Sequence, residues 1–251
     1  MSKYRSHAFR MKTLNHILCI YCVFLPLVLI AQENISVDFV AVSPDIAISD
    51  LYYQNGDQIV AFNVPTNRRS KKQHYRGPAT ANFFKITGAP EDPKAKRIPV
   101  AQVAFDQSQE FPLLIFLPKN GTGKEAYKVT AIEDSYKKIP GQSMRFVNLT
   151  ANPLGLLLGE EGKTRIPLRK GDVGNYVFPA DTPNLRIRIA IFNEDTAEAG
   201  LDKRLFSNSE ARTIYFIYKI RKGSPAVRLK SMRDTVKKAK SLQNPEPDKA
   251  S

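Results

Sequence analysis

The stretch Leu185-Arg186-Ile187-Arg188-Ile189 alternates strictly between apolar and cationic residues, and Val227-Arg228-Leu229-Lys230 repeats the pattern. A period of two places every second side chain on the same face, as in a β-strand with one face on a core and the other in water. Similar runs, rich in β-branched or aromatic residues and separated by Gly, Pro, Asn or Asp, fill the chain. They span residues 37–42, 50–53, 59–64, 81–86, 98–105, 113–117, 127–132, 144–149, 154–158, 165–168, 185–192, 213–220 and 227–232.

No stretch before residue 230 shows a convincing helical stripe. Roughly seven short strands per ~100 residues, with turn signals between them, are typical of an antiparallel β-sandwich of immunoglobulin or transthyretin type. We therefore predict an all-β protein made of two tandem antiparallel β-sandwich domains.

The two halves of the chain also match each other in order, as expected of an internal duplication. Phe39-Val40 corresponds to Phe146-Val147, and Gly56 corresponds to Gly162 at almost the same offset. Further along, segment 105–116 corresponds to 206–217 and segment 129–132 to 229–232, with the offset decreasing steadily. We predict sandwich domains at residues 32–138 and 139–235. The Lys-rich and then Pro-rich tail, 236–251, is expected to be disordered.

Residues 1–31 have the layout of a secretory signal peptide. Four cations and no acid precede an apolar run from Ile17 to Ile30, and the small residue Ala31 follows it. The run is shorter than the ~20 residues of a spanning helix and contains Pro26, although an uncleaved membrane anchor is the alternative. We predict an extracytoplasmic protein, periplasmic, cell-surface or secreted, that meets the membrane only transiently through this segment.

Cleavage after Ala31 would remove both cysteines and leave His74 as the single histidine. Stability must then come from apolar cores, since no disulfide is possible. The leader carries +4 of the formal net charge of +14, so the mature chain would hold +10. Such a charge favours anionic partners such as cell-wall polymers, lipid headgroups or nucleic acid, although a solubilising role is equally compatible with it.

The segment FVAVSPDIAISDLYYQNG, residues 39–56, carries a resemblance to a known group of proteins. Its triplets Ser43-Pro44-Asp45 and Asp50-Leu51-Tyr52 resemble the signature of an uncharacterised family of bacterial extracytoplasmic β-sandwich repeats. The second half has Ala151-Asn152-Pro153 in place of the first triplet and lacks the second triplet. The resemblance is confined to this short segment; it implies a secreted or surface β-sandwich protein and supplies no catalytic residue.

Motifs for catalysis or metal binding are weak. No G-x-S-x-G sequence is present, and His74 lies in a basic run where we expect a solvated imidazole. One histidine and no cysteine exclude the usual zinc sites, and we predict no cofactor. Four pairs of acidic residues are adjacent in sequence, at 91–92, 133–134, 160–161 and 194–195. Neighbouring side chains point to opposite faces of a strand, which argues against shared catalysis. A hydrolase with two carboxylates that converge in space stays an alternative.

The most concentrated feature is the basic segment 68–76, which we expect to form a loop between strands. Arginine forks there are suited to phosphate or uronate groups, and an aromatic ring is suited to stacking on a sugar or base. A charged loop that discourages edge pairing is the plainer interpretation. The candidate binding residues for an anionic ligand are Arg68, Arg69, Lys71, Lys72, Tyr75 and Arg76.

These observations favour an exported, non-enzymatic binding or scaffolding protein of the cell envelope. Its partner would be another envelope protein or an anionic polymer, without sequence-specific recognition of nucleic acid. The alternatives are a periplasmic assembly chaperone, by analogy of fold alone, and the carboxylate hydrolase named above.

Overall fold

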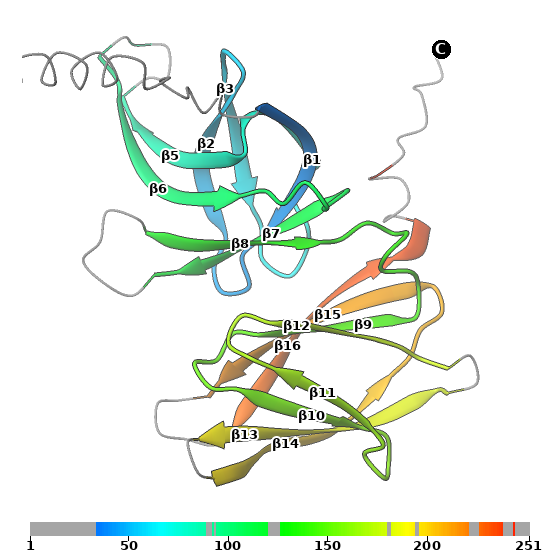
Figure 1. The fold of residues 1–251 in the computed structure, drawn as a ribbon. Coiled ribbons are helices and arrows are strands. Elements are labelled where there is room, and N and C mark those ends of the chain that lie inside the picture. The colour runs from blue at the N-terminus through cyan, green and yellow to red at the C-terminus, as the bar shows by residue number, and fades with distance from the viewer. Residues whose placement is uncertain are drawn as a thin grey trace, which may run out of the picture. The chain divides into compact units, whose positions relative to one another are not determined.

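The computed structural model describes residues 34–88, 92, 94–119, 126–179, 182–193, 196–220, 226–237 and 243. Within these residues the elements are sixteen β-strands, which form four sheets of four strands (Figure 1). The prediction of an all-β protein with two sandwiches is confirmed. The predicted signal peptide, residues 1–31, lies outside the described residues, as does the predicted tail apart from residues 236, 237 and 243.

The first sandwich consists of two sheets with the strand orders β4-β1-β7-β8 and β3-β2-β5-β6. Strands β1 and β7 pair in parallel, and the other pairs are antiparallel. The strands are β1 (Asn34–Val42), β2 (Ile48–Asn55), β3 (Gln58–Val64), β4 (Gln73–Pro78), β5 (Thr80–Thr87), β6 (Lys96–Ala104), β7 (Pro112–Pro118) and β8 (Tyr127–Glu133).

The second sandwich has the orders β12-β9-β15-β16 and β11-β10-β13-β14. Here β9 and β15 pair in parallel. The strands are β9 (Ser143–Asn148), β10 (Leu154–Leu158), β11 (Thr164–Leu168), β12 (Val173–Val177), β13 (Asn184–Asn193), β14 (Thr196–Phe206), β15 (Ala211–Lys219) and β16 (Val227–Thr235).

Strand by strand, the second sandwich repeats the topology of the first, with β9 in the place of β1 and β16 in the place of β8. The sequence matches between the halves fall on equivalent elements. Gly56 and Gly162, for example, occupy the β2–β3 and β10–β11 turns with φ values of 56° and 64°. Among the described residues the immunoglobulin order, in which the first two strands share a sheet, is not found, because β1 and β2, and likewise β9 and β10, lie in different sheets. The shared order supports duplication of one ancestral unit.

Strand β1 shows why the sequence is apolar at consecutive positions there. Phe39 and Ala41 face the core of the first sandwich, whereas Val40 and Val42 belong to a separate apolar cluster on the opposite face of the sheet. A strand buried on both faces reads as a continuous apolar run instead of an alternating one. The run in β7 has the same explanation.

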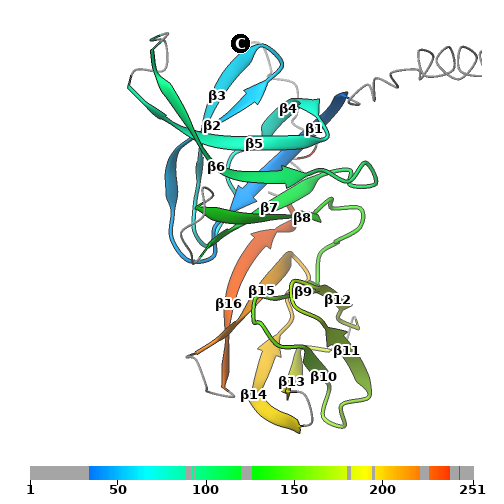
Figure 2. The ribbon, with the colours of Figure 1, turned by 60° about the vertical axis from the view of Figure 1, so that its left-hand side comes forward.

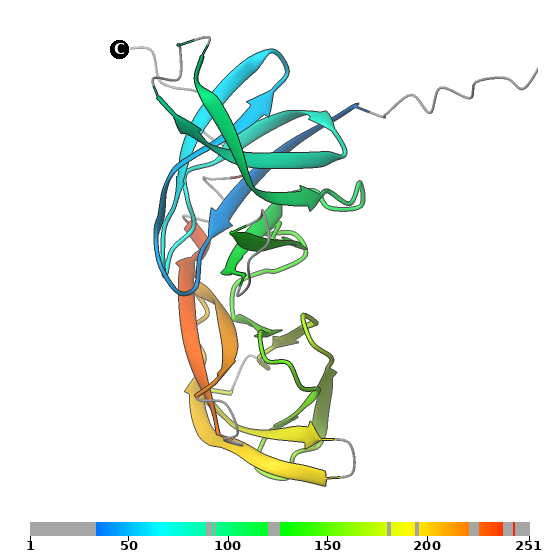
Figure 3. The ribbon, with the colours of Figure 1, turned by 90° about the vertical axis from the view of Figure 1, so that its left-hand side faces the viewer.

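This separate cluster is a shared apolar layer between the two sandwiches. The β1-β7-β8 face of one sheet packs on the β9-β15-β16 face of another. Figure 3 shows β1 in blue and β15 and β16 in orange to red. Both sandwiches therefore belong to one compact unit. The buried members of the layer are Val40, Val42, Phe111, Leu113, Ile115, Ile132, Val147, Ile214, Phe216 and Met232.

Three strands, β4, β12 and β14, have no counterpart among the runs predicted from sequence. The first two are equivalent edge strands, one in each sandwich. Strand β4 occupies Gln73–Pro78, so the basic segment 68–76 is a loop only in its first part. That strand positions the candidate site.

Candidate functional site

In the structure, some side chains of the basic segment are buried and others are exposed to solvent. Tyr75 is buried in the core of the first sandwich, whereas His74 and Arg76 on either side of it are exposed. Strand geometry explains this, because neighbouring side chains point to opposite faces. The segment therefore presents some of its charges to solvent and conceals others.

Arg69 is one of the concealed residues. It donates two hydrogen bonds to Asp134, from Nε at 2.5 Å and from Nη2 at 2.9 Å, and its Nη1 lies 3.2 Å from Asp234 Oδ2. Its side chain is 2% exposed. The prediction that Arg69 belongs to a surface binding set is therefore wrong, because its guanidinium is saturated by buried carboxylates.

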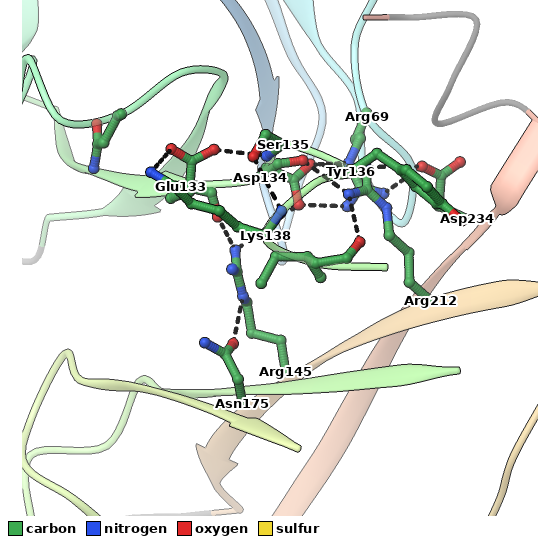
Figure 4. A network of polar contacts seen from close by, with 12 residues as sticks. Arg69, Glu133, Asp134, Ser135, Tyr136, Lys138, Arg145, Asn175, Arg212 and Asp234 are labelled. Atoms are coloured by element: carbon green, nitrogen blue, oxygen red, sulfur yellow. Dashed lines mark hydrogen bonds and ion pairs between the residues drawn. The ribbon is translucent and has the colours of Figure 1, made fainter. Parts of the chain in front are cut away.

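Arg69 forms part of a buried charge cluster that joins both sandwiches (Figure 4). Arg212 Nη2 lies 3.3 Å from both Asp134 Oδ2 and Asp234 Oδ2, and Arg145 Nη1 lies 3.8 Å from Asp134 Oδ1. Asp134 follows β8 in the first sandwich, whereas Asp234 lies at the end of β16, which Figure 2 shows directed toward β7 and β8. We call Arg69, Asp134, Arg145, Arg212 and Asp234 the buried charge cluster.

Backbone oxygens complete the cluster, since three guanidinium groups face only two carboxylates. Arg212 Nη1 donates to Asp134 O at 2.8 Å, and Arg145 donates to Glu133 O. Burial lowers the pKa of Arg145 to about 10 despite the nearby Asp134 carboxylate, so it stays protonated at neutral pH. For Arg69 burial acts in the same direction, but Asp134 and Asp234 outweigh it and raise the pKa. The cluster is a structural element with no access for a polymer.

The aromatic ring of Tyr75 is also buried, although this residue contributes to the lining of a cleft described below. It is 3% exposed and packs in the core beside Phe105, with ring centroids 5.3 Å apart. Its hydroxyl donates to Pro78 O at 2.8 Å, and burial raises its pKa. The predicted stacking role of Tyr75 is thus wrong for the same reason as the predicted binding role of Arg69, namely burial.

Lys72 is partly neutralised by a neighbour on β1. Its Nζ lies 3.0 Å from Asp38 Oδ2, and His74 Nδ1 lies 2.8 Å from Asp38 Oδ1. Burial would raise the pKa of Asp38, but the hydrogen bonds with His74 and Lys72 outweigh it and lower the pKa. Of the predicted residues, Arg68, Lys71 and Arg76 remain exposed and have no ion-pair partner in the described part of the chain.

Arg76 differs from the other two because it lines a cleft. The cleft has a volume of about 530 Å³ and lies between the β2–β3 turn and the β4–β5 region of the first sandwich. We call it the Arg76–Arg97 cleft. Its lining residues are Asn34, Gln54, Gly56, Asp57, Tyr75, Arg76, Gly77, Pro78, Thr80, Asn82, Phe84 and Arg97.

The β2–β3 turn and β4 are tied together at the Arg76–Arg97 cleft. Gly56 N donates to Arg76 O at 2.7 Å, and Arg76 N donates to Asn55 Oδ1 at 2.7 Å. Gly56 has a φ of 56°, which a residue without Cβ adopts at little cost. These bonds fix the Arg76 backbone while leaving its guanidinium exposed.

Arg97 is held by two contacts at the same cleft. Its Nη1 donates to Gln54 Oε1 at 3.1 Å, and its Cζ lies 5.3 Å from the centroid of the Phe84 ring. Gln54 is in turn fixed by a hydrogen bond from Nε2 to Gly56 O at 2.8 Å. A guanidinium carries five N–H donors, so Arg97 retains donors for a ligand.

The lining of the cleft is suited to a ligand with hydroxyl and carboxylate groups. Gln54 and Asn82 carry side-chain amides with both donors and acceptors, and Asp57 accepts hydrogen bonds. The two guanidinium groups match the planar geometry of a carboxylate. Asp57 is the single carboxylate in the lining, and no group of three metal-ligating side chains occurs among the described residues.

Sequence reasoning missed Arg97, Gln54 and Asn82. Arg97 belongs to β6, two strands after the β4 strand of Arg76, and no local pattern distinguishes it from other cations. Only the antiparallel pairing of β2, β5 and β6 brings these side chains together.

The chain matches no known protein family, and no match is found among curated proteins. Among the described residues, no helix has the length and apolar character needed to cross a bilayer.

The signature triplet Ser43-Pro44-Asp45 follows β1 and reaches the second sandwich. Lys230 Nζ on β16 donates to Pro44 O. Asp50 of the second triplet has a φ of 56°, and its N–H donates to Asn63 Oδ1 at 3.1 Å. These residues are therefore placed for structural roles, and the resemblance itself stays a prediction.

Proposed function

We propose that the chain is an exported, non-enzymatic binding protein that holds an acidic saccharide polymer in the Arg76–Arg97 cleft. The observation that carries the proposal is the pair of exposed guanidinium groups in one cleft, whose lining also contains three side-chain amides, one carboxylate and the Phe84 ring. A uronate residue carries a carboxylate for the arginines and hydroxyls for the amides and Asp57. The net positive charge of the chain would attract such a polymer from solution.

The hydrolase alternative receives no support at this cleft, because Asp57 lacks a second carboxylate beside it in the lining. Glycoside hydrolysis usually requires a pair of carboxyl groups about 5–10 Å apart. We therefore propose binding without turnover.

The test is titration of the protein with polygalacturonate, with dextran as the uncharged control. The double variant Arg76→Gln/Arg97→Gln should bind polygalacturonate at least tenfold more weakly, since each charged hydrogen bond contributes about 1.5–3 kcal/mol. Arg68→Gln/Lys71→Gln removes the same charge outside the cleft and should change the affinity less than twofold. Equal losses in the two variants would show that diffuse charge, and not this cleft, binds the polymer.

The proposed export has its own test. Amino-terminal sequencing of the protein recovered from outside the cytosol should begin at Gln32. Recovery of an intact Met1 terminus on a membrane fraction would instead support the anchor.

A further inference from the structure

A second cleft, of about 520 Å³, lies between the two sandwiches. We call it the junction cleft. Its floor is apolar and combines Ile115 and Leu117 of β7 with Val147 of β9 and the following Leu149. Ile115 and Val147 are buried members of the shared apolar layer, and the two leucines are partly buried against that layer. Only Leu117 and Leu149 of the floor retain solvent-exposed apolar surface, because Ile115 and Val147 are buried beneath them. Covering the exposed part of these two leucines with an apolar group would be favourable.

The walls of the junction cleft carry three exposed lysines from three different segments. Lys119 follows β7, Lys128 lies on β8, and Lys170 lies between β11 and β12. Asp45 is the one carboxylate in the lining, so the charged side chains sum to +2. A cationic rim over an apolar floor differs in chemistry from the Arg76–Arg97 cleft, whose lining carries two guanidinium groups, three side-chain amides and one carboxylate.

The second-sandwich wall is fixed before any ligand arrives. Asn148 Nδ2 donates to the carbonyl oxygens of Asn152, Leu168 and Arg169 at 2.9–3.1 Å. Gly171 N donates to Asn148 O at 2.9 Å, which holds the loop that carries Lys170. A pre-formed wall reduces the entropy lost on binding.

Tyr218 of β15 completes the lining. Burial raises its pKa, and the Asp45 carboxylate acts in the same direction, so its hydroxyl stays neutral at physiological pH. The lining thus offers an apolar surface, a neutral hydroxyl and lysines, and its volume is in the range of small-molecule sites.

We infer that the junction cleft binds a single amphiphilic anion, an alkyl chain that carries a carboxylate or phosphate. The chain covers the apolar floor, and the head group pairs with Lys128 and Lys170. Lysine suits this role because its ammonium is a point charge on a flexible stem, with no demand for a planar partner. This site is independent of the proposed saccharide site, since the two clefts share no lining residue.

The test is calorimetric titration of the purified protein with octanoate and dodecanoate below their micelle concentrations. Each methylene buried on the floor should strengthen binding about fourfold. Dodecanoate has four more methylenes than octanoate, so burial of only two of them should make it bind at least tenfold more tightly. Equal affinities would mean adsorption by charge alone and would overturn the inference. Dodecyl phosphate should bind as dodecanoate does, because the rim recognises charge.

Variants locate the site. Lys128→Gln/Lys170→Gln should weaken dodecanoate binding at least tenfold, whereas the control Arg68→Gln/Lys71→Gln should change it less than twofold. Leu117→Gln should remove the dependence on chain length, with its melting temperature measured alongside to confirm folding. Full binding by the lysine variant, or binding to anionic phospholipid vesicles without binding of soluble dodecanoate, would contradict the proposal. Polygalacturonate binding should be unchanged in these variants.

Discussion

Substitution of Asp134 by Asn should destabilise the protein strongly. The Asp134 carboxylate accepts two hydrogen bonds from Arg69 and one from Arg212, and the side chains of all three residues are no more than 2% exposed. Asparagine keeps the shape of the side chain but removes its charge, which leaves three buried guanidinium groups with Asp234 as their one carboxylate. Breaking a buried ion pair from one side costs about 3–5 kcal/mol.

A loss of this size is easily measured by thermal and urea unfolding. For a domain of this size, each kcal/mol lowers the melting temperature by about 2–4 °C, so a fall of roughly 6–20 °C is expected. Asp202→Asn is the matched control, because Asp202 also accepts two hydrogen bonds from one arginine, Arg186, but at the surface. That change should be barely measurable, since exposed ion pairs contribute little. Equal melting temperatures for the two variants would refute a stabilising role for the buried charge cluster.

Three further changes test the account of stability. Phe216→Ala, in the shared apolar layer, should lower the free energy of unfolding by about 3–5 kcal/mol; a loss below about 1 kcal/mol would mean that the layer is loosely packed. Gly162→Ala should destabilise more than Gly56→Ala. An added Cβ at Gly162 meets Leu157 Cβ at 3.3 Å and displaces the flexible Arg188 guanidinium, whose Nη2 lies 2.7 Å away, whereas nothing beyond the neighbouring residues lies within 4 Å at Gly56; equal effects in urea would contradict this. Burial would raise the pKa of Glu133, but hydrogen bonds from the backbone N–H groups of residues 135 and 110 outweigh this effect and lower the pKa. The stabilising contribution of ionised Glu133 is therefore present above pH ~4.5 and is lost as the pH falls through the lowered pKa. The difference in unfolding free energy between the wild type and Glu133→Gln should therefore shrink in acid, and a constant difference from pH 7 to pH 3 would refute it.

Most of the fold follows from local sequence. Alternation in β13 and continuous apolar runs in β1 and β7 predict strands correctly. A strand buried on one face alternates between apolar and polar residues, and a strand buried on both faces is apolar throughout. The strand missed in the basic segment, β4, is a short edge strand with a single fully buried side chain, Tyr75. Such a strand has too little apolar content to be distinguished from a loop.

The candidate site is harder to predict from sequence, because the burial and ion pairing of each basic side chain depend on residues far away in the chain. Arg69 is buried and Arg68 is exposed although they are adjacent and chemically identical. The partners of Arg69 are Asp134, which follows the last strand of the first sandwich, and Asp234, near the end of the second. Only the packing of one sandwich on the other brings Arg69 close to both aspartates, and no local sequence pattern predicts that contact.

The proposed function rests on the fork geometry of two guanidinium groups and not on their charge alone. The double variant Arg76→Lys/Arg97→Lys keeps both positive charges but removes the planar forks, which lysine does not replace. Its affinity for polygalacturonate, measured at fixed ionic strength, should fall at least fivefold below that of the wild type. Wild-type affinity in this variant would contradict recognition of a uronate by Arg76 and Arg97.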